Sequence, residues 1–170
     1  NGKILQSATD LANKNLSINI TFHDIITFKV HFPVTGMYRT NFLLEKLGGF
    51  DESLSAEDYD INLKIIQNTK IGYIEEKLYF YRSPAALGGT RSRPVMRLDV
   101  SESHRKTIEK YKDSDSYREA IKEWNFRRFI YFSSYVGRKK YALQGMFGAM
   151  EKINTPIFWK ALIRTIFYWK

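Results

Sequence analysis

The chain has no cysteine among its 170 residues. This absence excludes disulfide bonds, cysteine-ligated zinc, iron–sulfur clusters and thiol catalysis. The sequence also lacks an uninterrupted run of about 20 apolar residues, so no segment is expected to span a bilayer. It contains no internal repeat and no low-complexity segment. What remains is a globular composition of single-domain size, with 44% hydrophobic and 26% charged residues.

The sequence begins at Asn1, and no secretory signal pattern follows it. We therefore expect the chain to be a segment of a longer protein.

The net charge of +9 is unevenly distributed along the chain. Residues 1–96 carry 11 Lys/Arg and 10 Asp/Glu, whereas residues 97–170 carry 16 and 8. A basic chain suggests binding to nucleic acid or to an anionic membrane surface. Residues 51–60, however, contain five acids and no base, which a polyanion-binding surface would not include. We therefore predict two regions, residues 1–98 and a basic helical region over residues 99–170.

Short strands and helices are predicted to alternate in the first region. Residues 20–32 are mostly apolar and compatible with either a helix or a strand. Three short strands are predicted, over residues 33–39, 71–74 and 78–81. Two helices are predicted, over residues 40–47 and 56–68, the second with Tyr59, Leu63 and Ile66 on one apolar stripe. Gly48 and Gly49 would end the first helix, and Ser55 with Asp58 would form a capping box at the start of the second.

The second region is predicted to be helical throughout, over residues 101–112, 116–136, 139–152 and 156–170. Pro156 suits the first position of the last helix. That helix combines aromatic residues with Lys160 and Arg164 and is too short to cross a bilayer. It is typical of an interfacial helix on anionic lipid. It would equally suit a helix packed on the domain with a solvated basic edge.

Two adjacent carboxylates, Glu57 and Asp58, stand at the predicted start of the helix over residues 56–68. Acids in a first helical turn stabilise the helix by complementing its dipole. One of them could instead act as a general base that removes a proton from an incoming nucleophile. The pair by itself does not decide between these interpretations.

The wider order of motifs over residues 28–83 resembles family-2 glycosyltransferases, inverting sugar-nucleotide enzymes with the GT-A fold. The matching segments are Met37-Tyr38-Arg39, Leu47-Gly48-Gly49-Phe50-Asp51-Glu52, Glu57-Asp58-Tyr59-Asp60, Lys70-Ile71-Gly72-Tyr73-Ile74 and Tyr79-Phe80-Tyr81-Arg82. The resemblance implies an α/β fold, the C-terminal portion of a GT-A (nucleotide-diphospho-sugar transferase) fold, followed by a mostly helical extension. The nucleotide-binding half would then lie upstream of Asn1.

The resemblance also implies roles for individual residues. Asp58 would be the general base, and Glu57 would orient Asp58 or the acceptor. Asp60 is a candidate for substrate binding, with a structural role as the alternative. The candidates for binding the leaving diphosphate are Arg39, Arg82, Arg91 and Arg93, because guanidinium groups bind phosphate through two hydrogen bonds.

A divalent metal, Mg²⁺ or Mn²⁺, is implied for the full-length enzyme, with most ligands outside this segment. The triplet Asp58-Tyr59-Asp60 matches the Asp-x-Asp pattern of the family's metal motif. It lies in the acceptor-side helix, so we do not assign it to the metal. Pro84 occupies the position where many members carry a histidine ligand. The three histidines, His23, His31 and His104, lack metal-ligand spacing and are interpreted as structural. The Gln-x-x-Arg-Trp motif of processive synthases is also missing.

The sequence thus predicts an inverting glycosyltransferase of glycan, lipopolysaccharide or exopolysaccharide synthesis. Its partners would be a nucleotide-diphospho-sugar donor and a sugar or lipid-linked acceptor. Its location would be cytoplasmic, with peripheral contact to the membrane through residues 156–170 as an option. The alternative is a non-catalytic basic helical module that binds nucleic acid or an anionic membrane surface. No helix-turn-helix, RNA-recognition or zinc-finger signature supports specific nucleic-acid binding.

Overall fold

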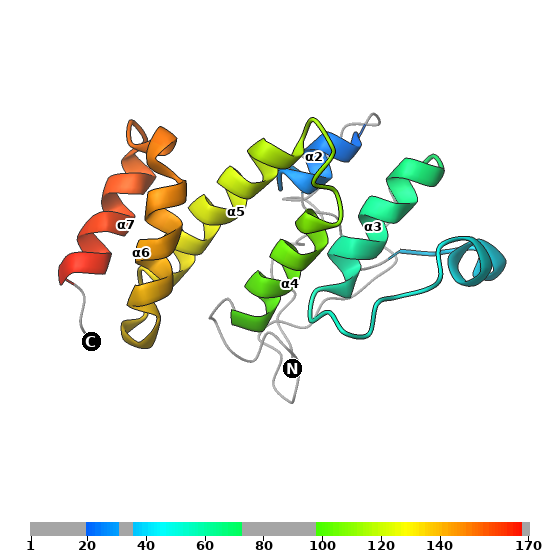
Figure 1. The fold of residues 1–170 in the computed structure, drawn as a ribbon, viewed down its shortest axis with the longest axis horizontal. Helices are drawn as coiled ribbons and strands as arrows, with labels where there is room; N and C mark the ends of the chain where they lie inside the picture. The colour runs from blue at the N-terminus through cyan, green and yellow to red at the C-terminus, as the bar shows by residue number, and fades with distance from the viewer. Residues whose placement is uncertain (1–19, 31–35, 73–97, 168–170) are drawn as a thin grey trace, which may run out of the picture.

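The computed structural model describes residues 20–30, 36–72 and 98–167. Within these ranges every regular element is helical. In chain order the elements are α2 (Phe22–Ile26), the π-helix η1 (Phe42–Lys46), α3 (Glu57–Asn68), α4 (Leu98–Glu109), α5 (Tyr117–Phe132), the 3₁₀ turn η3 (Val136–Arg138), α6 (Lys139–Gly148), the 3₁₀ turn η4 (Met150–Lys152) and α7 (Pro156–Phe167). The helices succeed one another along the long axis, from η1 at one end to α6 and α7 at the other (Figure 1).

The expected α/β architecture, the C-terminal portion of a GT-A fold, is wrong for the described residues, because no strand occurs in them. Residues 36–39, the described part of one expected strand, have no regular structure, and Met37 there is 89% exposed. A strand needs a hydrogen-bonded neighbour, and none of the described segments provides one. The expected strand over residues 78–81 lies outside the described residues. Of the one over residues 71–74, only residues 71–72 are described, without regular structure.

Within residues 20–32, where the sequence allowed a helix or a strand, residues 22–26 form the short helix α2. Thr21 is its N-cap and forms a capping box with Asp24. The Thr21 hydroxyl accepts the Asp24 N–H at 3.2 Å, and the Asp24 carboxylate accepts the Thr21 N–H at 3.0 Å. These two bonds satisfy N–H groups that a helix start leaves without partners. The helix buries Ile25 and Ile26.

A first core cluster joins α2, α3, α4 and the beginning of α5. Its buried members are Ile25, Ile26, Leu63, Ile108, Ala120 and Trp124. The predicted apolar stripe of α3 is confirmed, because Leu63 is fully buried and Tyr59 and Ile66 pack against the cluster. Two hydrogen bonds tie side chains of the cluster to neighbouring backbone. The Tyr59 hydroxyl donates to the Ile26 carbonyl at 2.8 Å, and the Trp124 indole donates to the Ser101 carbonyl at 2.8 Å.

The predicted helix over residues 56–68 is confirmed as α3, but its predicted capping box is wrong. The N-cap is Ala56, which makes no side-chain cap hydrogen bond. Ser55 faces α4 instead, because its hydroxyl donates to the Asp99 carboxylate at 3.0 Å and its N–H donates to the Ser103 hydroxyl at 2.7 Å. Ser55 therefore fixes the start of α3 to α4 through tertiary contacts.

In the predicted helix over residues 40–47, a helical turn at residues 40–41 continues into the π-helix η1. The helix ends before Gly48 and Gly49, as predicted. Gly48 and Gly49 both have φ of +74°, a conformation that glycine adopts without steric cost.

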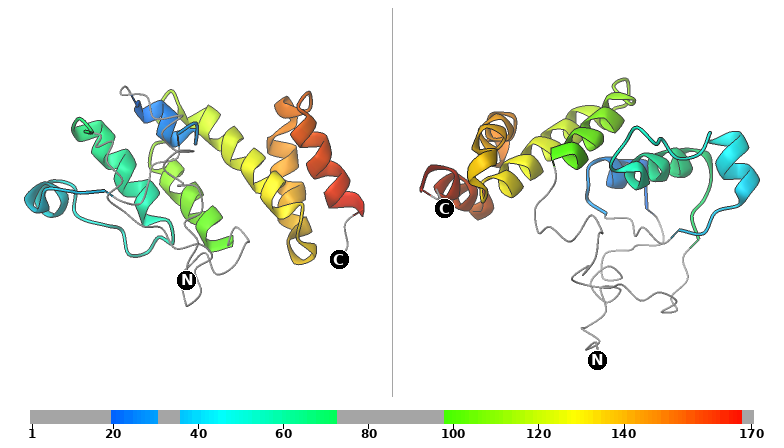
Figure 2. Two further views of the ribbon diagram at one scale, coloured as in Figure 1. Left: turned by 180° about the vertical axis from the view of Figure 1, so that it is seen from behind. Right: turned by 90° about the horizontal axis from the view of Figure 1, so that it is seen from below.

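A second core cluster joins the end of α5 to α6 and α7. Its buried members are Phe129, Phe132, Ala142, Phe158 and Ala161. Gly145 allows α6 to approach α5 closely, because a Cβ there would meet the Asn125 carbonyl oxygen at 2.6 Å. Helices α6 and α7 lie side by side at this end of the molecule in both views (Figures 1 and 2). The two clusters divide within α5, whereas the sequence division was placed at residue 98.

Candidate functional site

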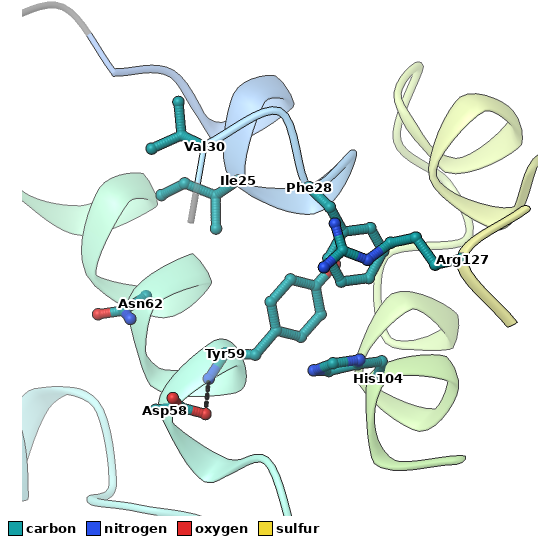
Figure 3. Close-up of a pocket in the computed structure, with 8 residues that line it drawn as sticks. All are labelled: Ile25, Phe28, Val30, Asp58, Tyr59, Asn62, His104 and Arg127. Atoms are coloured by element: carbon teal, nitrogen blue, oxygen red, sulfur yellow. Dashed lines mark hydrogen bonds between the residues drawn. The ribbon is translucent and has the colours of Figure 1, made fainter. Parts of the chain in front are cut away.

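A small pocket lies where α2, α3, α4 and α5 meet (Figure 3). Its volume is about 50 Å³. The residues that line it are Ile25, Phe28, Val30, Asp58, Tyr59, Asn62, His104 and Arg127. Asp58 is the predicted site residue that this pocket contains.

Asp58 owes its position to the start of α3, where it is the second helical residue. It is partly buried, and its carboxylate accepts the Tyr59 N–H at 2.9 Å. An acidic side chain in a first helical turn complements the free N–H groups and the helix dipole. Tyr38 lies within electrostatic range of this carboxylate: burial raises the pKa of Tyr38, and the Asp58 charge raises it further.

Three rings form the aromatic part of the pocket. Phe28 and Tyr59 stack with centroids 4.9 Å apart and planes 8° apart. The His104 ring packs against Tyr59 at 4.9 Å and against Phe28 at 5.2 Å (Figure 3). Burial raises the pKa of Tyr59 well above its usual range. Tyr59 is therefore neutral at physiological pH, and its hydroxyl is occupied by the bond to Ile26.

Phe28 adopts an unusual backbone conformation, with φ of +58°. A left-handed conformation costs a non-glycine residue about 1–2 kcal/mol. Phe28 follows the end of α2, and its backbone conformation places the phenyl ring between Tyr59 and Arg127. The Arg127 guanidinium lies 4.7 Å from the Phe28 ring centroid, a cation–π contact that helps to offset the strain (Figure 3).

Arg127 is the cationic group of the pocket. Its Nε is buried and has no hydrogen-bond partner among the described residues. A buried guanidinium N–H without an acceptor is unfavourable. The positive charge of the guanidinium would favour an anionic group that entered the pocket.

Asp60, two residues beyond Asp58, forms ion pairs with two lysines. It is fully buried, and its carboxylate accepts a hydrogen bond from Lys110 at 2.7 Å and forms an ion pair with Lys64 at 3.2 Å. The Lys110 ammonium also donates to Asp51 at 2.9 Å. These contacts favour a structural role for Asp60 in joining α3 to α4.

The same network of hydrogen bonds shifts the pKa values of Asp51 and Lys110. Hydrogen bonds from Ser53 and then Lys110 hold the pKa of Asp51 well below its usual range. Burial lowers the pKa of Lys110, but its bonds to Asp60 and Asp51 outweigh burial, and the pKa is raised overall. The acidic stretch over residues 51–60 is thus partly neutralised by α4.

The other predicted site residues are not collected in the pocket. Glu57 is exposed at the start of α3, and Arg39 is exposed in the segment before η1; neither lines the pocket. Arg82, Arg91 and Arg93 lie outside the described residues. Of the predicted set, the described part of the chain therefore brings only Asp58 to the pocket.

The described residues do not fit a divalent metal. In these residues no group of three histidine, aspartate or glutamate side chains could hold one. Magnesium and similar ions prefer several oxygen ligands. Of the acids beside Asp58, Glu57 is exposed outside the pocket and Asp60 already pairs with lysines. The divalent metal implied for the full-length enzyme, with most ligands outside this segment, stays a prediction.

Sequence reasoning missed four residues of the pocket: Phe28, Asn62, His104 and Arg127. His104 was interpreted as structural, and it packs as an aromatic ring, yet it lines the pocket. No local pattern marked Arg127, because its place depends on how α5 packs against α2. His23 contacts the Ser116 hydroxyl at 3.0 Å, as a structural residue would, and His31 lies outside the described residues.

Comparisons of the chain with protein-family models, with curated proteins and with solved structures found no match. A function for this site therefore has to follow from its residues and their geometry.

Proposed function

We propose that the protein transfers a sugar from a nucleotide-diphospho-sugar to an acceptor hydroxyl with inversion, and that Asp58 is the general base. The supporting observation is that the Asp58 carboxylate lines a pocket that also contains Arg127, whose buried Nε lacks a partner in the described residues. The ordered motifs around Asp58, which resemble inverting glycosyltransferases, are the second support.

The reaction needs one base on the acceptor side. The acceptor hydroxyl oxygen attacks the anomeric carbon as the bond from that carbon to the diphosphate oxygen breaks. The hydroxyl proton passes to the Asp58 carboxylate as the new C–O bond forms. Glu57, beside Asp58 and exposed, would orient the acceptor.

The size of the pocket limits what it holds. A volume of about 50 Å³ is far below the roughly 300–1,000 Å³ of ordinary ligand pockets. It suits the reacting hydroxyl or a similarly small group, so the donor would bind outside it. Arg127 would then stabilise negative charge near the reacting atoms.

The decisive variant is Asp58→Asn in the longest natural form of the protein. Asparagine keeps the shape of the side chain but does not accept the proton. We expect kcat for transfer from UDP-, GDP- and dTDP-hexoses to fall by about 10²–10⁴-fold, with KM for the donor nearly unchanged. The measurement is release of nucleoside diphosphate in the presence of a lipid-linked or oligosaccharide acceptor.

Asp113→Asn serves as the matched control, because Asp113 is an exposed acid in the turn between α4 and α5. It removes the same charge and should transfer sugar at the wild-type rate. Transfer by Asp58→Asn within a few-fold of wild type would exclude Asp58 as the base. A wild-type protein that turns over no donor in the panel would contradict the proposed activity.

A further inference from the structure

Helix α7 has an apolar face that is exposed in the described part of the structure. Phe158, Ala161 and Thr165 are buried on the side that meets the second core cluster. Large apolar side chains, each between 49% and 74% exposed, occupy five other positions: Ile157, Trp159, Ile163, Ile166 and Phe167. Helical spacing places Ile157 beside Lys160 and Arg164, and the other four on the side away from the core. A surface helix normally presents charged or polar residues to solvent, so this face indicates a binding surface.

We propose that α7 docks on an anionic phospholipid surface, lying in the plane of the interface with this apolar face inserted. The docking is independent of the sugar transfer proposed above. Tryptophan and phenylalanine with isoleucine on one side, beside basic residues, are typical of interfacial helices.

The charge of the surrounding region favours an anionic surface. Residues 124–170 contain nine Lys/Arg and a single acid, Glu151, which pairs with Lys122 at 2.6 Å. Acids outside this range pair with two of the nine, Arg128 with Glu102 at 3.0 Å and Lys152 with Glu123. The region still has an excess of positive charge, which an anionic membrane attracts, and salt weakens the attraction.

The structure also holds basic residues next to α7. The Lys139 ammonium donates to the Ser133 carbonyl and, at 2.5 Å, to the Arg164 carbonyl near the C-terminal end of α7. A cation there satisfies carbonyl groups that a helix end leaves free. The exposed Lys140 follows directly, and the exposed Lys160 lies on α7 itself. The charges and the apolar face therefore belong to one end of the molecule.

Insertion parallel to the surface agrees with the length of α7. In the part of the chain that the structure describes, no helix is long and apolar enough to cross a membrane. The 12 residues of α7 extend about 18 Å, compared with a hydrocarbon core of about 30 Å.

A second copy of the chain fits this face less well than lipid does. Dimerisation through α7 would bring two basic ends together, each with more Lys/Arg than the acids that pair with them. A nucleic acid would match the charge but not the exposed isoleucine and phenylalanine side chains.

The test is co-sedimentation of the full chain with vesicles of phosphatidylcholine alone or mixed equally with phosphatidylglycerol. We expect at least about tenfold stronger partitioning onto the anionic vesicles, reduced by 0.5 M salt. The variant Trp159→Ser/Ile163→Ser/Phe167→Ser should lower partitioning by about 100-fold, because three apolar side chains no longer insert. Lys140→Gln/Lys160→Gln should lower it several-fold and flatten the salt dependence.

The control is Met37→Ser/Leu44→Ser, which removes two exposed apolar side chains at the opposite end of the molecule (Figure 1). It should bind as wild type does, and circular dichroism should show unchanged helix content in every variant. Equal partitioning of the α7 triple variant and wild type would overturn the proposal. So would equal binding to neutral and anionic vesicles, or a dimer in light scattering that the triple variant abolishes without any vesicle binding.

Discussion

The two core clusters stabilise their surroundings in different ways. Around the first, polar groups are paired between helices, as in the ion pair of Asp60 with Lys110 and the hydrogen bond from Trp124 to Ser101. Around the second, Phe129 packs against Phe158 at 5.0 Å, α6 approaches α5 through Gly145, and the Lys139 ammonium donates to backbone carbonyls rather than to an acid. The first cluster borders the pocket with Asp58, whereas the second supports the exposed apolar face of α7.

The two regions differ in what they contribute: one provides most of the candidate site, and the other carries most of the net charge. Residues 1–96 are nearly neutral, yet they provide Asp58 and most of the pocket. The basic excess lies almost entirely in residues 97–170, and α5 is shared by both clusters. The net charge of the whole chain therefore describes neither region. The stability of each region can be tested with a variant that changes one core cluster.

The largest effect is expected from Phe129→Ala, which leaves a cavity in the second cluster. Phe129, a residue of α5, is fully buried and packs against Phe158 of α7. We expect the free energy of unfolding to fall by about 3–5 kcal/mol in urea titrations. Hydrogen exchange should accelerate in α6 and α7 more than in α3. Equal acceleration in α3 would show that the two clusters unfold as a single unit.

A smaller effect is expected from Lys110→Met in the first cluster. The variant removes the closest partner of the buried Asp60 carboxylate but leaves its ion pair with Lys64, so the free energy of unfolding should fall by about 1.5–3 kcal/mol at pH 7. The raised pKa of Lys110 contributes stability that is present below about pH 10.4 and is lost as pH rises through its folded value. The lowered pKa of Asp51 contributes stability that is present above about pH 3.9 and is lost as pH falls.

Wild type and Lys110→Met should therefore differ most between about pH 4 and pH 10 and approach each other outside that window. Thermal unfolding at about pH 2, 7 and 12 measures the difference, because the Lys110 contribution is lost only above its raised folded pKa and the Asp51 contribution only towards its lowered one. Lys112→Met is the control, because Lys112 is an exposed lysine two residues away. A pH-independent difference would contradict the role given to the ion pairs.

The smallest effects are expected from the helix caps, one in each region. The Thr155 hydroxyl accepts the Phe158 N–H at 3.3 Å at the start of α7, and Thr21 caps α2. Thr155→Ala and Thr21→Ala should each lower stability by about 1 kcal/mol. Thr155→Ala should accelerate hydrogen exchange in α7, and Thr21→Ala in α2. Exchange that rises equally in both helices for either variant would argue against separate regions.

Most helix positions could be predicted from local pattern. The apolar stripe through Leu63 indicated α3, Pro156 marked the start of α7, and Gly48 with Gly49 ended the helical turn before them. The capping box at Ser55 was predicted wrongly, because Asp99 and Ser103 of α4 bind Ser55 instead. The strand over residues 33–39 failed for a related reason: its apolar residues suited a strand, but residues 36–39 have no neighbouring strand in the described structure.

Composition and short-range pattern thus established the absence of thiol chemistry, the separation of charge and the order of the helices, because these depend on residues within a few positions of each other. Packing alone decided that Asp58 lines the pocket with His104 and Arg127, and that Asp60 pairs with Lys110. It also decided which side of α7 is left exposed. Such features arise from contacts between helices far apart in the chain, and no single segment carries the information that places them.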